Sequence, residues 1–406
     1  MDGHVAMVLR ESFPPDVRVQ KEARALLDAG IDVTVVCSKD PQRPKRETDD
    51  GIEIVRVGLD STGRLEKVSR HVRVALTGVR PEWCEALAGL ESLDAIHVHD
   101  LPMAGTALFV GERLRVPVVL DLHENYPAAV EQYRAAEPDW WRSPGDVAER
   151  LTFPVARFRR FERRWTKRAA HVVTVAAEAR RHYVHDCAVP PLDVSVVGNT
   201  VDLGSFDRSA PPTVDTDGFT VAYVGSFGPH RGLDTALRGF AEVAATAPDA
   251  EFLLVGSGAQ SVVDGLGALV SDLGISDRVT APGWVDFEAV PGYIAAADVC
   301  LVPHARTEHT ATTIPHKLFQ YMAMERPVVV TDVPPLERIV SATDSGRVVP
   351  AGDARELGDT LEALRTDPSE RRRLGENGRE AVEHRYNWAT DAETLRSIYA
   401  ELIEGS

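Results

Sequence analysis

Short runs of β-branched and apolar residues alternate with segments of helical periodicity along almost the whole of this 406-residue chain. In the first half, strands are expected at residues 4–10, 32–38, 52–58, 95–99, 116–123, 171–176 and 194–197. Several intervening segments have apolar residues at helical spacing, for example Val19, Ala23 and Leu26 before Gly30. Strands that alternate with helices form parallel sheets, so the pattern predicts an α/β fold.

The alternation stops once, between residues 203 and 218, where Pro211, Pro212 and several aspartates replace the apolar pattern. A second series follows, with strands expected at residues 219–225, 251–256, 278–280, 299–303, 327–331 and 346–349. We therefore predict two doubly wound domains, at 1–202 and 219–386, joined by a linker at 203–218. The last segment, 387–406, is predicted to be a helix that packs back on the first domain. Ligands of open α/β sheets bind at the carboxyl ends of the strands, so a shared cleft is expected.

Composition excludes several classes of protein. The apolar runs are shorter than the roughly 18 residues of a membrane-spanning helix. A net charge of −17 argues against general nucleic-acid binding, which needs a concentrated positive surface. The acidic, lysine-poor composition resembles that of halophilic proteins, although a GC-rich genome would also favour arginine. The four cysteines lie far apart, which argues against a disulfide framework and a structural zinc site. The N-terminus has no basic leader, which predicts a cytoplasmic protein.

The strongest candidate site follows the strand expected at 299–303. Residues 312–315 form a turn, and a helix is expected to run from Lys317 to Met324. Free N–H groups at a helix start, with a lysine in the first turn, suit a diphosphate. A solvated lysine is the alternative, but the position after a strand end favours the anion site.

Residues 315–323 also resemble the donor-binding motif of family 4 of the retaining glycosyltransferases, in the variant P-x-K-x-x-x-Y-M-A. Further segments resemble other parts of this family in the same order: VLRESFPPDVRVQKEARALLDAGIDVTVV, AIHVHDLP, VPVVLDLHENYP, VVGNTVD, VAYVGSFGPHRGLDTAL, FLLVGSG and APGWV. The resemblance implies a GT-B fold, with two Rossmann-like domains, and sugar transfer from a nucleotide sugar with retention at the anomeric carbon.

The resemblance also assigns roles to particular residues. Arg231 and Lys317 match the cations that stabilise the leaving diphosphate, and His123 matches a histidine near the reacting carbon of the sugar. We expect Arg231 and Lys317 to face the cleft, so that their substitution would leave the folded state nearly unaffected. Arg231 as a surface residue of its loop, and His123 as an ordinary hydrogen-bonding histidine, are the alternatives.

Two further sets of residues are candidates for substrate contacts. The donor-binding set is Gly225, Ser226, Gly256, Gly258, Trp284, Thr312, Thr313, Ile314, Pro315, His316 and Gln320. The acceptor-side set is Asp16, Arg18, His99, Asp100 and Glu124. A tight strand-to-helix turn explains Gly256 and Gly258 equally well, Trp284 suits the core as well as the base, and His99 and Asp100 suit helix capping.

The chain departs from the family pattern at three places. Thr312 and Gln320 stand where most members have two glutamates, Ser226 replaces an arginine, and residues 13–16 replace the glycine pair of the first loop. These changes bear on the donor contacts and on the acceptor side.

Neither a metal nor another cofactor is expected. Asp215 and Asp217 imitate the DxD of metal-dependent transferases, but they precede a strand, so a solvated acidic turn is favoured. The segment 150–168 combines eight basic residues with aromatic ones, which suits an anionic membrane surface. We slightly favour the alternative, a core helix whose arginines meet the protein's own carboxylates.

The leading hypothesis is a retaining, metal-independent glycosyltransferase that moves a sugar from a UDP- or GDP-sugar to a glycan or lipid-linked acceptor. Two alternatives remain: a GT-B epimerase of nucleotide sugars and a non-catalytic GT-B partner subunit, the latter because both motif glutamates are replaced.

Overall fold

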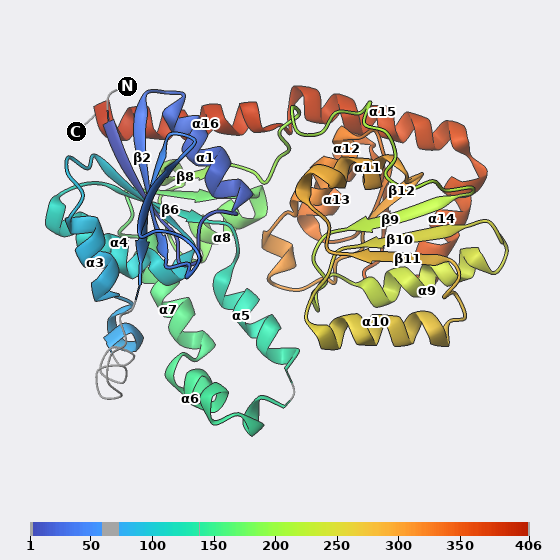
Figure 1. Ribbon diagram of the computed structural model, residues 1–406, viewed down its shortest axis with the longest axis horizontal. Coiled ribbons are helices and arrows are strands. Elements are labelled where there is room, and N and C mark those ends of the chain that lie inside the picture. The colour runs from blue at the N-terminus through green and yellow to red at the C-terminus, as the bar shows by residue number, and fades with distance from the viewer. Residues whose placement is uncertain (1–2, 59–72, 138, 405–406) are drawn as a thin grey trace. The chain divides into compact units, whose positions relative to one another are not determined.

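The computed structural model describes residues 3–58, 73–137 and 139–404. The chain divides into two compact units, Met1–Val197 with Asp391–Ser406, and Gly198–Thr390. Each unit is a parallel sheet with helices on its faces, as the sequence predicts, and is described by itself (Figure 1).

The first unit contains an eight-stranded sheet in the order β3-β4-β2-β1-β5-β6-β7-β8. Its strands are β1 Gly3–Val8, β2 Ile31–Ser38, β3 Arg46–Asp49, β4 Ile52–Val57, β5 Ala95–His99, β6 Val118–Leu122, β7 His171–Thr174 and β8 Val194–Val196. Its helices are α1 Val17–Leu27, α3 Pro81–Ala88, α4 Leu101–Leu114, α5 Tyr126–Ala135, α6 Pro144–Thr152, α7 Val155–Thr166 and α8 Ala177–His185. The sequence analysis missed β3, which pairs antiparallel with β4 at the sheet edge and has no apolar alternation.

The second unit contains a six-stranded sheet in the order β11-β10-β9-β12-β13-β14. Its strands are β9 Thr220–Val224, β10 Glu251–Val255, β11 Val279–Gly283, β12 Val299–Val302, β13 Val328–Thr331 and β14 Gly346–Val349. Its helices are α9 Leu233–Ala244, α10 Gln260–Asp272, α11 Val290–Ala295, α12 His316–Ala323, α13 Pro334–Thr343, α14 Ala354–Thr366 and α15 Pro368–His384. Every residue of β9, β12 and β13 is buried, as expected for strands covered on both faces.

The strand orders place a switch point in each sheet. In the first unit, β2, β4 and β3 lie on one side of β1, and the later strands β5 to β8 lie on its other side. In the second unit, β10 and β11 lie on one side of β9, and β12 to β14 lie on the other. The loops that follow these strands diverge to opposite faces, so a space for a ligand opens at the carboxyl ends of the strands. His99, Gly225 and His304 lie at or just beyond these ends.

The boundary between the units lies earlier than the sequence analysis places it. Residues 198–202 belong to the second unit, because Val201 pairs with Asn387 and the Asn199 side chain donates to the carbonyl of Ile314. The predicted linker at 203–218 also belongs to that unit: Phe206 is buried and packs edge-on against Phe287. A segment without periodicity can still pack, because periodicity reports secondary structure only.

The last helix, α16 Trp388–Glu404, begins in the second unit and continues into the first. There the Tyr399 hydroxyl lies 2.7 Å from Nδ1 of buried His97, and Arg396 donates to the carbonyl of Ala25. Among the residues that the structure describes, no helix combines the length and apolar character needed to cross a membrane.

Tyr399→Phe removes the hydroxyl that pairs with His97 and keeps the ring. We expect the free energy of unfolding to fall by about 1 to 3 kcal/mol, because a polar atom of a buried histidine loses its partner. Chemical denaturation measures the change. Tyr386→Phe, at a half-buried tyrosine of the second unit, is the matched control, and equal stability of Tyr399→Phe and the parent would contradict the assignment.

Candidate active site

Glycines allow close packing at the carboxyl ends of β9 and β10. Gly225 has a φ of +137°, and a Cβ built there would lie 2.6 Å from the Lys317 amine. A Cβ at Gly256 would lie 2.0 Å from the Gly225 carbonyl oxygen, and one at Gly258 would lie 2.3 Å from that of Phe227. Close packing of the two loops therefore explains why residues 256 and 258 are glycines, which agrees with the alternative that these glycines have a structural role. At Gly225 the free space is taken by a cation.

Lys317, in the first turn of α12, is a buried lysine, only 7% exposed. Its amine lies 3.4 Å from the centroid of the Tyr223 ring and has no hydrogen-bond partner in the described part of the chain. Burial holds the pKa of Lys317 well below its ordinary value, and the nearby Arg231 guanidinium lowers it further. The Lys317 side chain therefore lies in the interior, and the effect of its substitution on the folded state stays a prediction.

Arg231 precedes α9 and reaches the same region. Its Nη1 lies 3.1 Å from Nε2 of His304, which accepts as a neutral imidazole. The rings of His304 and His309 pack edge-on against His230, at 5.8 and 5.1 Å between centroids. Burial and the nearby cations lower the pKa of His230 to about 3 and hold that of His304 well below its ordinary value.

The arrangement of these groups suits an anion. Lys317 and Arg231 are the two basic groups here, and among the described residues Arg231 is the one charged group that shifts the pKa of Lys317. The start of α12 lacks a side-chain cap, since its N-cap residue is Pro315. A phosphate group at this helix start would meet both cations and the helix dipole, which is the requirement for binding and stabilising a diphosphate.

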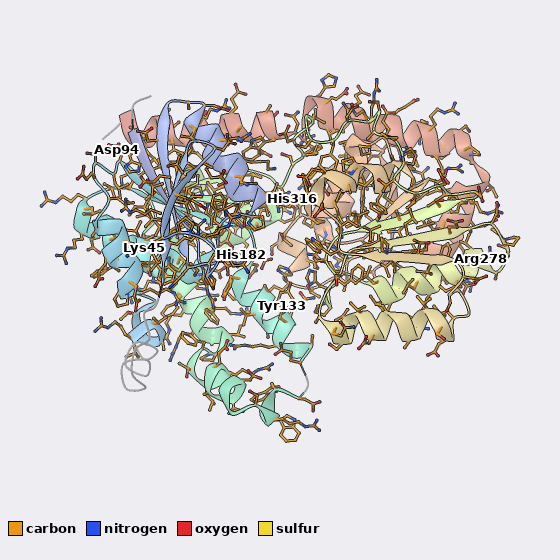
Figure 2. All side chains as sticks on the ribbon, in the orientation of Figure 1. Lys45, Asp94, Tyr133, His182, Arg278 and His316 are labelled. Atoms are coloured by element: carbon orange, nitrogen blue, oxygen red, sulfur yellow. The ribbon has the colours of Figure 1, made fainter. Side chains whose placement is uncertain are left out.

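The remaining donor-binding candidates lie around this helix or at the strand ends. Trp284, which follows β11, is 73% exposed, and this excludes the core alternative. Gln320 is half-buried one turn after Lys317, and Ser226 is exposed beside Gly225. Ile314 is buried with its carbonyl bound to Asn199, and Figure 2 labels His316 at the start of α12. Thr312 donates to the carbonyl of Glu308, and Thr313 is the half-buried residue that follows it.

In the first unit, a network of buried charges surrounds Asp121, the fourth residue of β6. Arg18 binds both oxygens of this carboxylate, at 2.8 and 3.0 Å, and its Nη2 lies 2.9 Å from Glu22. His99 lies 3.2 Å from the same carboxylate. Arg18 is therefore occupied inside the unit, which leaves its guanidinium no exposed face for an acceptor, in contrast to the acceptor-side expectation.

His123 is the member of this network that is open to solvent. Its Nε2 lies 2.6 Å from the Asp121 carboxylate, its Nδ1 lies 3.7 Å from Asp100, and its side chain is 17% exposed. Burial by itself would lower the pKa of His123, but the two carboxylates outweigh it and raise the pKa to about 9. At neutral pH His123 is therefore a protonated imidazole held in a fixed orientation, which is a hydrogen-bond donor suited to a sugar oxygen.

The other acceptor-side candidates have structural contacts of their own. Asp16 caps α1 by accepting from the backbone of Arg18 and Val19. Asp100 precedes α4 with a φ of +65°, a backbone conformation that costs a non-glycine residue about 1 to 3 kcal/mol. Glu124 is half-buried, and its carbonyl accepts from the Tyr183 hydroxyl at 3.4 Å.

An open cavity of about 640 Å³ also lies in the first unit. Arg10, Arg80, Tyr126, Glu149, Phe158 and Trp165 are among the residues that line it. Its wall is partly aromatic and partly charged, which suits a ligand with both polar and apolar portions. Sequence reasoning did not identify this cavity, because its lining comes from segments far apart in the chain.

The basic segment contains parts of α6 and α7, which extend with α5 away from the sheet (Figure 1). Phe161 and Trp165 are buried and stack at 4.3 Å between ring centroids. Several of the arginines meet carboxylates of the same unit: Arg150 with Glu137, Arg159 with Glu131, and Arg168 with Glu112. These contacts agree with the core-helix interpretation, and contact with a membrane stays a prediction.

Some residues of the two clusters were not identified from the sequence. Asp121, Glu22 and His97 are missing from the predicted set of the first unit. In the second unit, His230, His304 and His309 are missing. A usable signal was present for His304, which directly follows an expected strand at Pro303, as His123 follows β6.

Two family models of glycosyltransferases match parts of this chain. Residues 218–367 match the family model described as "Glycosyl transferases group 1", and residues 16–205 match the one described as "Glycosyltransferase Family 4". The chain is 26% identical over 319 residues to an alpha-D-kanosaminyltransferase of Streptomyces kanamyceticus, covering 76% of this chain and 77% of that protein. It is 25% identical over 311 residues to an MMP alpha-(1->4)-mannosyltransferase of Mycolicibacterium hassiacum, covering 75% and 70%.

Solved structures share the fold over the full length. Sucrose-phosphate synthase from Thermosynechococcus elongatus matches with a TM-score of 0.76 and 22% identity, covering 100% of both chains. Anabaena HepE in complex with UDP and glucose matches with a TM-score of 0.70 and 15% identity, covering 97% of this chain and 99% of that one. The two units therefore have the GT-B fold.

The charge of His123 should make stability depend on pH. Its pKa of about 9 in the folded state exceeds the ordinary value of 6.5, so the stability that it contributes is present below pH 6.5 and is lost as the pH rises through 9. We expect the difference in unfolding free energy between the parent and His123→Gln to shrink by up to about 3 kcal/mol from pH 6 to pH 9.5. Denaturant titrations at each pH measure it, with exposed His185→Gln as control. A difference that stays constant across this range would contradict the assignment.

Proposed function

We propose that this chain is a member of glycosyltransferase family 4 and transfers a sugar from a UDP- or GDP-sugar to a glycan or lipid-linked acceptor, with retention at the anomeric carbon and without a metal. The named relatives are transferases, which does not favour an epimerase or a non-catalytic subunit. Structures similar in fold have been solved with UDP and glucose, which supports a nucleotide-sugar donor.

The buried amine of Lys317 is the observation that carries this proposal. A lysine taken out of water without a counter-charge costs stability, so the cluster needs an anion to be favourable. A nucleotide diphosphate brings two adjacent phosphate groups to Lys317 and Arg231. As the bond to the sugar breaks, negative charge grows on the leaving diphosphate, and preorganised cations stabilise it without a metal ion.

The acceptor side of the proposal rests on the first unit. We assign to His123 a hydrogen bond to the transferred sugar, because its protonated ring is fixed by Asp121 and is partly exposed. The open cavity lined by Arg10, Tyr126 and Trp165 is the candidate acceptor site. Its aromatic wall suits an acceptor with an apolar portion, such as a lipid-linked sugar, and its arginines suit an anionic group.

Lys317→Met tests the role of the buried cation. In calorimetric titrations, the parent should bind one nucleoside diphosphate among UDP, GDP and ADP with little change on addition of EDTA. The variant should lose at least about 100-fold in kcat/KM, the usual scale for a lost charge-stabilising group, and should bind the diphosphate more weakly. Without ligand it should be at least as stable as the parent, because a buried charge has been removed.

Lys167→Met, at the exposed lysine that directly follows α7, is the matched control and should resemble the parent. Nucleotide binding by Lys317→Met that equals binding by the parent would contradict the anion site. NMR of the product, which identifies its anomeric configuration, decides between retention and inversion.

Gln320→Ala tests the position of the donor ribose. Gln320 stands where the family has a glutamate that accepts from the ribose hydroxyls, and an amide keeps one carbonyl acceptor. We expect Gln320→Ala to weaken nucleotide binding by about 1 to 3 kcal/mol, while Gln320→Glu retains or improves it. Unchanged affinity in Gln320→Ala would place the ribose elsewhere, with Glu308 as the better candidate.

A further inference from the structure

Glu162, His182 and Cys187 form a second cluster of metal-binding groups in the first unit, apart from the network around Asp121. Glu162 lies on α7, His182 on α8, and Cys187 two residues after α8 ends. One Glu162 oxygen lies 3.5 Å from His182 Nε2, and the Cys187 sulfur lies 3.8 Å from the same nitrogen. The three donor atoms all lie within 4.8 Å of one another, and Figure 2 labels His182.

The two separations that involve His182 Nε2 are close to the edges of a tetrahedral zinc site. Zinc bonds of about 2.0 to 2.2 Å to nitrogen and oxygen and about 2.3 Å to sulfur place tetrahedral ligands about 3.3 to 3.7 Å apart. The observed 3.5 and 3.8 Å are close to these values. A thiolate, an imidazole and a carboxylate are also a donor set that zinc accepts, whereas calcium and magnesium prefer oxygen alone.

The His182 ring is oriented by a carboxylate on its far side. Its Nδ1 lies 2.9 Å from Asp186, one helical turn later, while its Nε2 points toward Glu162 and Cys187. In zinc proteins a metal-binding histidine usually donates its other ring N–H to such a carboxylate, which fixes the tautomer and the ring orientation. The His182 side chain is 15% exposed, so solvent reaches the cluster.

The backbone holds the three ligands in place before any ion binds. The amide N–H groups of Asp186 and Cys187 both donate to the carbonyl of His182, which turns Cys187 back toward the end of α8. On α7 the Thr166 hydroxyl donates to the carbonyl of Glu162. Cys187 is 1% exposed and Glu162 is 3% exposed, so neither side chain is free to turn to the surface.

The network around Asp121 offers a useful contrast. One possible ligand atom from each of Glu22, His97, His99 and Asp121 also lies within 4.8 Å of the others. The Arg18 guanidinium, however, lies within 3.0 Å of both carboxylates there and takes the place that a cation would occupy. Glu162 has no arginine within ion-pair distance among the described residues that surround it, and its ion-pair partner is His182.

Against the expectation from the sequence, in which the distant cysteines argue against a structural zinc site, we infer that Glu162, His182 and Cys187 bind one zinc ion, which ties α7 to α8 and leaves a fourth position for water. The Cys187 thiol releases its proton on binding, and neutral His182 coordinates through Nε2 while Nδ1–H donates to Asp186. The role is structural: the ion stabilises the first unit and takes no part in sugar transfer. The metal-independent reaction proposed above and this site can therefore each fail without the other.

The test uses the full chain stripped with a chelator and then titrated with Zn²⁺ alone or Co²⁺ alone. The parent should bind one zinc ion, and with cobalt it should show the charge-transfer absorption of a cobalt–thiolate bond. His182→Gln and Cys187→Ser should each weaken zinc binding by at least about 100-fold, and the cobalt absorption should vanish in Cys187→Ser. His185→Gln, at an exposed histidine of the same helix, and Cys84→Ser, at another cysteine of the same unit, are the matched controls.

Asp186→Asn keeps the test decisive if a ligand variant fails to fold. Its carboxylate is exposed, so the substitution should preserve the fold and weaken zinc binding by about 10- to 100-fold through the lost support of His182. Zinc bound by the parent no more tightly than by folded Cys187→Ser or Asp186→Asn would overturn the inference. So would a cobalt–thiolate absorption that persists in Cys187→Ser but is lost in Cys84→Ser.

Discussion

The second unit buries the amine of Lys317 without a carboxylate partner among the described residues. Lys317 reaches its position because Gly225 has no side chain, and Arg231, His304 and Tyr223 surround it without a carboxylate in the described part of the chain. Such an arrangement lowers the stability of the ligand-free protein. In the proposed function, the same groups stabilise the negative charge that grows on the leaving diphosphate.

In the first unit, by contrast, the buried charge of Asp121 has partners of opposite charge. Asp121 is balanced by Arg18 and by the histidines around it, and the network continues through His97 to Tyr399 of α16. A balanced network orients its exposed member, His123, at little electrostatic cost. The C-terminal helix thus supports the same network as the first helix, and this explains why a segment so late in the chain belongs to the first unit.

Some of the departures from the family pattern change the charge in the region around Lys317. Thr312 and Gln320 are neutral where most members have glutamates, so the region around Lys317 contains less negative charge than the family pattern would give it. The planar guanidinium of Arg231 can bind two phosphate oxygens. The replacements at Thr312 and Gln320 remove negative charge from this region, whereas Ser226 in place of an arginine removes positive charge.

The sequence alone determined the two α/β units and nearly all of their strands, and it singled out Lys317 and Arg231 as candidate cations of a donor site. Strand and helix periods are local properties, and the P-x-K-x-x-x-Y-M-A segment lies within one helix and its turn. Tertiary structure decided which charges are paired and which are buried alone. Arg18 and Asp121 are 103 residues apart, and Glu162 and His182 meet across two helices. No local pattern records such pairs, because the folded backbone, and not the spacing along the chain, brings them together.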